Sequence, residues 1–381
     1  MNIKEKLKII AELYPQPRIE NTKKRLNAFW QKADIGNRFP YTIRRREIPL
    51  GKVNYSMDKL SHEESLHIQL DEIIRKAHLP DDYVPSLITS SNCYLLALEC
   101  GCELKEMDGL MVAEPRYSDL AAALTMSAPD LTRPKSLWRL TRERIAFFID
   151  KTEGQLPLHP PDPQGPLSTA TQILNQEEFF CALSLAPKKV RQFLEICTEI
   201  TADFISAIQK AIPTPLMVPI HCHPYLWRPA NGFALSEDML GVLGPDYFGD
   251  FGVPCLKRIA AQFGPLVLHS CGNCASTIRI FNDAANYLAA LNLAQTPMEE
   301  ICRSWPAKAL INISPADWAD LEMIKRYKES AQKWNIPTIF NICTVGTDIT
   351  QTAEHNPAVY QQIAEILKIT EKSGSNHKVK Y

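Results

Sequence analysis

Short apolar segments alternate with long helical patterns from about residue 170 onward, and this alternation constrains the fold more than any other feature. Helical patterns cover 187–212 and 236–263. Repeated strand–helix alternation produces βαβ units and a parallel sheet. The apolar segments between the helices predict strands at 215–223, 265–272, 287–294, 308–314 and 337–344. We therefore predict an α/β fold of the (β/α)8 TIM-barrel type.

An open, doubly wound sheet is the alternative to the barrel. Five clear strand–helix units, with more upstream, suit a closed barrel better than an open sheet. No Gly-rich dinucleotide fingerprint follows any of the expected strands, which disfavours a Rossmann domain.

The 381 residues divide into three expected regions. Residues 1–115 are predicted to form a helical and irregular extension packed on the barrel, opening with a helix at 3–13. Residues 116–372 are predicted to form the barrel, in which the Pro-rich stretch 156–166 is a loop. The polar tail 373–381 is expected to be flexible.

Composition excludes several classes of protein. Lys and Arg total 42 against 43 for Asp and Glu, so no charge excess favours nucleic acid or an anionic membrane as a partner. The run Arg44–Arg46 is a solvated patch or, less favoured, a phosphate-facing one. The charged N-terminus lacks the features of a signal peptide, and no apolar run has membrane-spanning length. We therefore expect a cytoplasmic protein whose 11 cysteines are free thiols or metal ligands.

Side chains alternate between the two faces of each expected strand. In most of these strands one face is apolar, which suits covering helices, and the other becomes polar toward the carboxyl end. Barrel active sites lie at the carboxyl ends of the strands, so we expect the polar face to line a pocket there. The alternative to a pocket is that each strand carries one buried polar residue whose hydrogen bonds are satisfied within the protein. The residues assigned to the polar face are His221, His223, His269, Cys271, Asn292, Asn312, Ser314, Asn341 and Cys343.

Three of these residues form a candidate zinc site. His269 and Cys271 are two apart on one strand and share a face, and imidazole and thiolate are preferred zinc ligands. Cys343 lies at the matching end of a later strand and is the expected third ligand. Cys274 competes for that role, although it follows the strand at the start of a helix expected at 274–285. A chain without metal is the remaining alternative.

Other residues are expected to contact the substrate. His221 and His223 are assigned to the pocket, with a satisfied buried histidine or a metal ligand as alternatives. Trp227 is expected either to stack against the substrate or to lie in the core. The remaining substrate-binding candidates are Asn273 and Asn312; no residue is assigned a catalytic role.

Several motifs, in order and sensibly spaced, resemble the uroporphyrinogen decarboxylase superfamily. They are DPQGPLSTATQIL at 162–174, DYFGDFGVPCLKRIAAQFG at 246–264, LHSCGN at 268–273, INISP at 311–315 and IFNICTVGTD at 339–348. Within it, the chain is similar to the methylcobamide:coenzyme M methyltransferases, which bind zinc through His-x-Cys and a later Cys. His269, Cys271 and Cys343 match that pattern, although the branch tends to have glycines around the last Cys and this chain has Asn341-Ile-Cys-Thr344.

The resemblance implies zinc-dependent transfer of a methyl group between a corrinoid, such as methylcobalamin, and a small thiol or methylated substrate. The corrinoid would be presented by a separate carrier protein, and the direction of transfer stays open. Two rivals remain. One is a metal-free decarboxylase, which carries an arginine-bearing N-terminal motif that the run Arg44–Arg46 does not reproduce. The other is a non-catalytic ligand-binding barrel. Hydrolysis is disfavoured because no carboxylate follows the ligands within HSCGNC or NICTV; Asp348 is the nearest candidate.

Overall fold

The structure is a computed structural model. It describes residues 1–31, 38–44, 60–107, 110–133, 136–221, 226–229, 231–281, 283–305, 310–317, 320–343 and 357–369.

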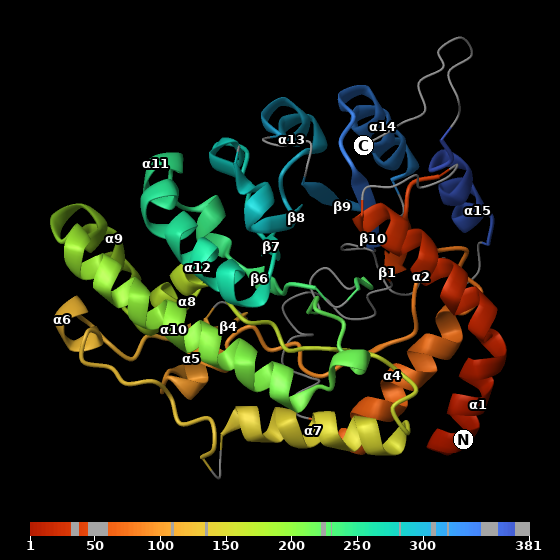
Figure 1. The fold of residues 1–381 in the computed structure, drawn as a ribbon, viewed down its shortest axis with the longest axis horizontal. Coiled ribbons are helices and arrows are strands. Elements are labelled where there is room, and N and C mark those ends of the chain that lie inside the picture. Colours follow the sequence, from red (N-terminus) through yellow and green to blue (C-terminus); the bar gives the residue numbers. More distant parts are fainter. Residues whose placement is uncertain are drawn as a thin grey trace.

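Six parallel strands form the central sheet, in the order β1-β10-β9-β8-β7-β6 (Figure 1). Their bounds are β1 Tyr41–Arg44, β6 Ala234–Ser236, β7 Leu266–Ser270, β8 Leu288–Leu293, β9 Ile311–Asp317 and β10 Thr338–Cys343. Four of the five strands expected from the apolar segments are therefore present. β1 belongs to residues 1–115, so the expected extension in fact supplies an edge strand of the sheet.

Both edges of this sheet are tied to a second parallel pair, β2 (Leu87–Ile88) with β5 (Leu158–His159). At one edge the Asp82 amide, just before β2, donates to the Tyr41 carbonyl at 2.8 Å. At the other, the Gly165 amide, after β5, donates to the Ser236 carbonyl at 2.7 Å. The result is a TIM-barrel-like α/β fold, which confirms the predicted fold class.

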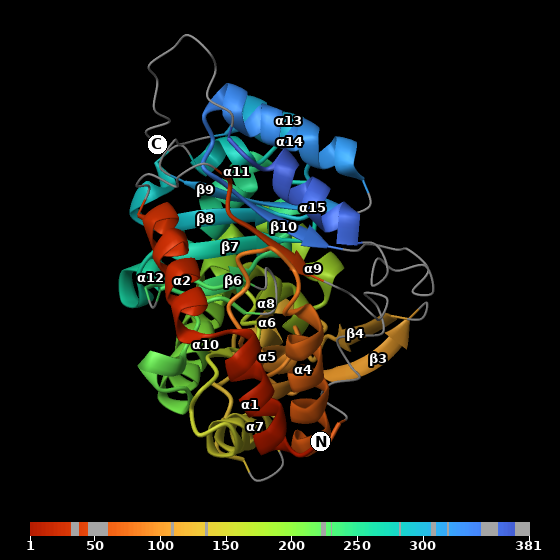
Figure 2. The ribbon, with the colours of Figure 1, turned by 90° about the vertical axis from the view of Figure 1, so that its right-hand side faces the viewer.

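Helices pack outside the strands. Helices α13, α14 and α15 lie along one side of the sheet, and the antiparallel hairpin β3–β4 projects from the body (Figure 2). The segment before β1 contacts the segment after α15, because the Phe39 amide donates to the Leu367 carbonyl. The bounds are α1 Ile3–Leu13, α2 Gln16–Trp30, α4 His62–Lys76, α5 Leu95–Glu99, β3 Glu103–Met107, β4 Leu110–Glu114, α6 Leu120–Ala123, α7 Leu137–Lys151, α8 Pro166–Ile173, α9 Gln176–Leu185, α10 Pro187–Ala211, α11 Pro245–Tyr247, α12 Val253–Phe263, α13 Met298–Ser304, α14 Leu321–Trp334 and α15 Pro357–Ile366.

Two helices match their predicted bounds closely. Helix α1 spans 3–13 as expected, because Asn2 and Glu5 form a capping box at its start. Helix α10 begins at Pro187, a favourable first helical position, and ends at Ala211. No described helix combines the length and the apolar character needed to cross a bilayer.

Four predicted elements differ from the structure. The Pro-rich stretch 156–166, predicted as a loop, contains β5, which pairs with β2. In the predicted strand 215–223, the described residues 215–221 form no regular strand, because Pro215 and Pro219 have no N–H for a ladder; among them Met217 makes an isolated bridge to Leu158. Residues 236–263 are not one helix: they begin with the end of β6 and are interrupted at Gly241 and Gly244 before α11. In place of the helix predicted at 274–285, the described residues 274–281 and 283–285 hold turns and short 3-10 segments.

The inner face of the sheet is built in two layers. The lower layer is apolar and packs Ala234, Val267, Ala290, Ile311 and Ile339 together. Two residues further along each strand, side chains return to the same face. There β6, β7, β8 and β10 present a buried polar layer near their carboxyl ends, formed by Ser236, His269, Asn292 and Asn341.

Candidate metal centre

The carboxyl end of β7 presents an imidazole and a thiol side by side. His269 is buried and Cys271 is exposed, and the distance between His269 Nε2 and Cys271 Sγ is 3.2 Å. Two ligands of one tetrahedral zinc, at ordinary Zn–N and Zn–S bond lengths, would stand ~3.6 Å apart. The pair therefore fits a shared metal after a displacement of a few tenths of an ångström.

A hydrogen-bond chain fixes which nitrogen of His269 faces the thiol. The Asn292 amide nitrogen donates to the Ile313 carbonyl at 2.7 Å, so its oxygen is turned toward His269. His269 Nδ1 lies 2.6 Å from Asn292 Oδ1. A carbonyl oxygen only accepts, so Nδ1 carries the proton and Nε2 presents its lone pair toward Cys271. This is the usual outer support of a metal-binding histidine.

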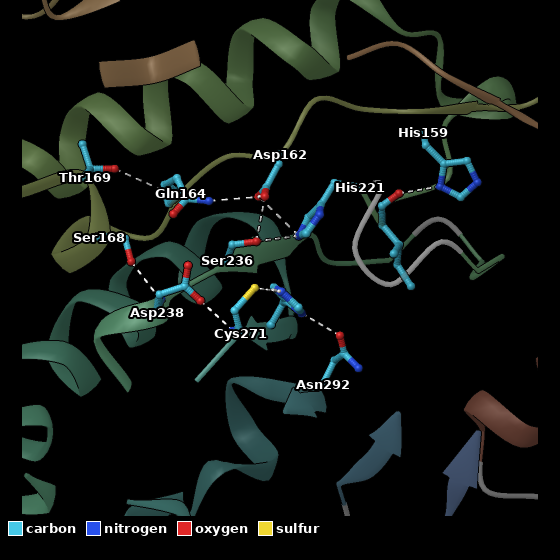
Figure 3. A network of polar contacts seen from close by, with 12 residues as sticks. His159, Asp162, Gln164, Ser168, Thr169, His221, Ser236, Asp238, Cys271 and Asn292 are labelled. Atoms are coloured by element: carbon cyan, nitrogen blue, oxygen red, sulfur yellow. Dashed lines mark hydrogen bonds and ion pairs between the residues drawn. The ribbon is translucent and has the colours of Figure 1, made fainter. Parts of the chain in front are cut away.

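A carboxylate completes the cluster. Asp238 lies just after β6, and its carboxylate, His269 and Cys271 offer ligand atoms within 4.8 Å of one another. Asp238 Oδ1 also accepts the Cys271 amide at 2.7 Å, which fixes the turn after β7 (Figure 3). Sequence analysis missed Asp238 because it assigned 236–263 to a helix. One signal was available: Gly241 and Gly244 break that helical pattern soon after Asp238.

The expected third ligand, Cys343, is the last residue of β10, where its backbone pairs with Asp317 and Arg44. Its side chain lies outside the described part of the structure, so its role stays a prediction. Cys274 is buried, with Sγ 3.5 Å from the Gly272 carbonyl, and burial raises the pKa of its thiol to about 11. It does not belong to the described ligand cluster.

A second polar cluster lies beside the first (Figure 3). Ser236 Oγ donates to Asp162 Oδ2 at 2.8 Å, and His221 Nε2 lies 3.5 Å from Asp162 Oδ1. The His221 ring stands edge-on to that of His269, with 6.3 Å between centroids. Burial, with smaller contributions from His269 and His159, holds the pKa of His221 well below its ordinary value, so the imidazole is neutral.

Asp162 provides a pH-dependent test of this cluster. Burial raises its pKa from 3.8 to about 7, so between these values the folded chain keeps a proton that the unfolded chain has released. The contribution of Asp162 to stability therefore falls as pH rises through this window. We expect Asp162→Asn to remove this part of the pH dependence of the free energy of unfolding. Urea unfolding of both metal-free proteins, from about pH 4 to about pH 7, measures it; identical pH slopes would contradict the assignment.

Two of the remaining predicted substrate residues, Trp227 and Asn312, lie away from this centre. Trp227 packs under the lower apolar layer, where the Trp30 indole donates to its carbonyl. Asn312 faces the helices, with Nδ2 3.2 Å from Met298 Sδ, because Ile311 and Ile313 occupy the inner face of β9. Trp227 thus takes the core position that was the alternative to a stacking role, and Asn312 lies on the face away from the candidate metal centre. Asn273 is exposed and caps the Ala275 amide, and His223 lies outside the described residues.

Comparison with solved structures identifies the fold. The chain shares the fold of a methyltransferase from Methanosarcina mazei. The two are 13% identical in sequence and superpose with a TM-score of 0.63, over 91% of this chain and 97% of the other. A malate synthase from Haloferax volcanii covers 69% of the chain with a TM-score of only 0.30. No family model matches the sequence, and no curated protein matches it either.

Proposed function

We propose that this protein is a zinc-dependent methyltransferase that moves a methyl group between a corrinoid on a partner protein and a small thiol or methylated substrate. The observation that carries the proposal is the His269–Cys271 pair, with its imidazole tautomer fixed by Asn292. The fold shared with a methyltransferase along nearly the whole chain supports it.

His269 and Cys271 would hold the zinc, together with Cys343 or Asp238. The ion would stabilise the thiolate of a bound substrate at neutral pH and leave it nucleophilic. Asn292 keeps His269 Nδ1 protonated, so that Nε2 is available as a neutral ligand. Asp238 holds the Cys271 amide and so sets the position of the thiol.

The released thiol proton needs an acceptor, and the second cluster offers one. Asp162 is buried beside His221, and its pKa of about 7 allows the carboxyl oxygen to take up or release a proton near neutrality. Ser236 keeps Asp162 Oδ2 oriented. We assign Asp162 as the group that accepts and holds the thiol proton during methyl transfer.

The position of Asp238 also supports metal-assisted hydrolysis as a second candidate function. The sequence placed no carboxylate beside the ligands, but the structure places Asp238 within 4.8 Å of both ligand atoms. A carboxylate beside a metal can act as the general base for water. We nevertheless favour methyl transfer, because Asp238 Oδ1 is already engaged by the Cys271 amide.

A methylcobalamin assay tests the proposal. Zinc-loaded protein is incubated with methylcobalamin and a panel of neutral, cationic and anionic thiols, and loss of the methylated corrinoid is followed by absorbance. We expect zinc-dependent turnover with at least one thiol and none after chelation. Zinc-dependent hydrolysis of esters or amides, without corrinoid turnover for any thiol or methyl donor, would overturn it.

A further inference from the structure

Glu237 makes an unusual cap for helix α8. Its carboxylate is fully buried and accepts the amides of Leu167 at 3.0 Å and Ser168 at 2.8 Å. These are early amides of α8, whose own N-cap residue, Gly165, has no side chain to offer. A carboxylate at this position satisfies orphan donors and complements the helix dipole. Residues about seventy apart in sequence are thereby joined.

The contact leaves no spare room. A Cβ on Gly165 would lie 2.3 Å from Glu237 Oε2, so a larger residue there would displace the carboxylate from its position. The start of α8 and the end of β6 are therefore held against one another by direct contact as well as by hydrogen bonds.

Ser168 extends this connection toward the candidate metal centre (Figure 3). Its hydroxyl donates to Glu237 Oε1 at 2.6 Å and accepts the Asp238 amide at 2.9 Å. One hydroxyl thus fixes the backbone of Asp238, whose carboxylate in turn accepts the Cys271 amide. The connection runs from α8 through Glu237, Ser168 and Asp238 to Cys271.

We propose that Ser168 and Glu237 are positioning residues for the metal centre: neither touches the ion, and both set its affinity by fixing Asp238 and Cys271. The inference rests on the zinc site of the proposed function, but not on methyl transfer. Outer residues that orient metal ligands typically contribute 10–100-fold to metal affinity.

Ser168→Ala is the decisive variant. It keeps both backbone bonds from α8 to Glu237 and removes the hydroxyl that bridges Glu237 Oε1 and the Asp238 amide. Thr171→Ala is its matched control, because Thr171 is buried on the same helix and its hydroxyl donates only to carbonyls of that helix. Zinc affinity is measured by chelator competition, and the Co²⁺-substituted proteins are compared by visible absorbance.

We expect Ser168→Ala to weaken zinc binding about 10-fold or more and to shift the cobalt spectrum, while Thr171→Ala changes neither. Glu237→Gln, which keeps the side-chain volume, should also weaken binding and serves if Ser168→Ala does not fold. Wild-type affinity and spectrum in the Ser168 and Glu237 variants, or equal losses in Thr171→Ala, would overturn the proposal. A wild-type chain that binds no zinc would overturn it together with the proposed function. Zinc binding without methyl transfer would overturn only the proposed reaction.

Discussion

Cys271→Ala is expected to abolish stoichiometric zinc binding and, with it, methyl transfer. Wild-type protein purified without chelator should carry about one zinc per chain. Cys271 supplies the thiol 3.2 Å from His269 Nε2, and its loss leaves the imidazole without its neighbouring ligand. Metal content by elemental analysis, with methylcobalamin turnover on the same samples, measures both effects.

Cys274→Ala is the matched control for this experiment. It removes a thiol three residues away that is buried and outside the described ligand cluster, so zinc should be retained. Zinc loss in the Cys274 variant, with retention in the Cys271 variant, would show that the ligands are wrongly assigned.

The same measurement on Cys343→Ala and Asp238→Ala separates the two candidates for the third ligand. The resemblance to the methylcobamide:coenzyme M methyltransferases favours Cys343, and the geometry places Asp238 at the centre. We expect Cys343→Ala to lose most of the zinc. Loss in Asp238→Ala alone would assign the carboxylate as the ligand instead.

Gly232→Ala is expected to destabilise the protein by about 3–5 kcal/mol, because two costs add at this position. Gly232 has φ +73°, a conformation that residues with a side chain rarely adopt. A Cβ there would also lie 1.9 Å from the Pro265 carbonyl oxygen. The residue immediately precedes Phe233, whose carbonyl accepts the Val267 amide, so the strain would act where β6 and β7 begin.

Gly244→Ala is the control for this substitution. Gly244 has φ −64°, and nothing lies within 4 Å of a Cβ built on it. Urea unfolding followed by circular dichroism compares the free energies of unfolding. Equal stability of the two variants would show that the Gly232 turn tolerates a side chain.

Much of the sheet could be predicted because its strands carry local signals. Four apolar segments between helical patterns gave β7, β8, β9 and β10, and the capped segment 3–13 gave α1. Strand alternation also put His269 and Cys271 on one side of β7. The alternation could not show which face of β9 turns inward, because both faces of Ile311–Asp317 contain buried residues and only the neighbouring strands and α13 decide between them.

The sequence by itself determined the fold class, most strands of the sheet and the imidazole–thiol pair, because each depends on residues close together in the chain. The tertiary structure alone decided the surroundings of that pair. Asn292, Asp238 and Ser168 reach it from three other elements, and the links between them join residues 21 to 70 positions apart. Neither residue type nor periodicity encodes such contacts. They arise only when the strands and helices pack, since packing determines which buried donor meets which acceptor.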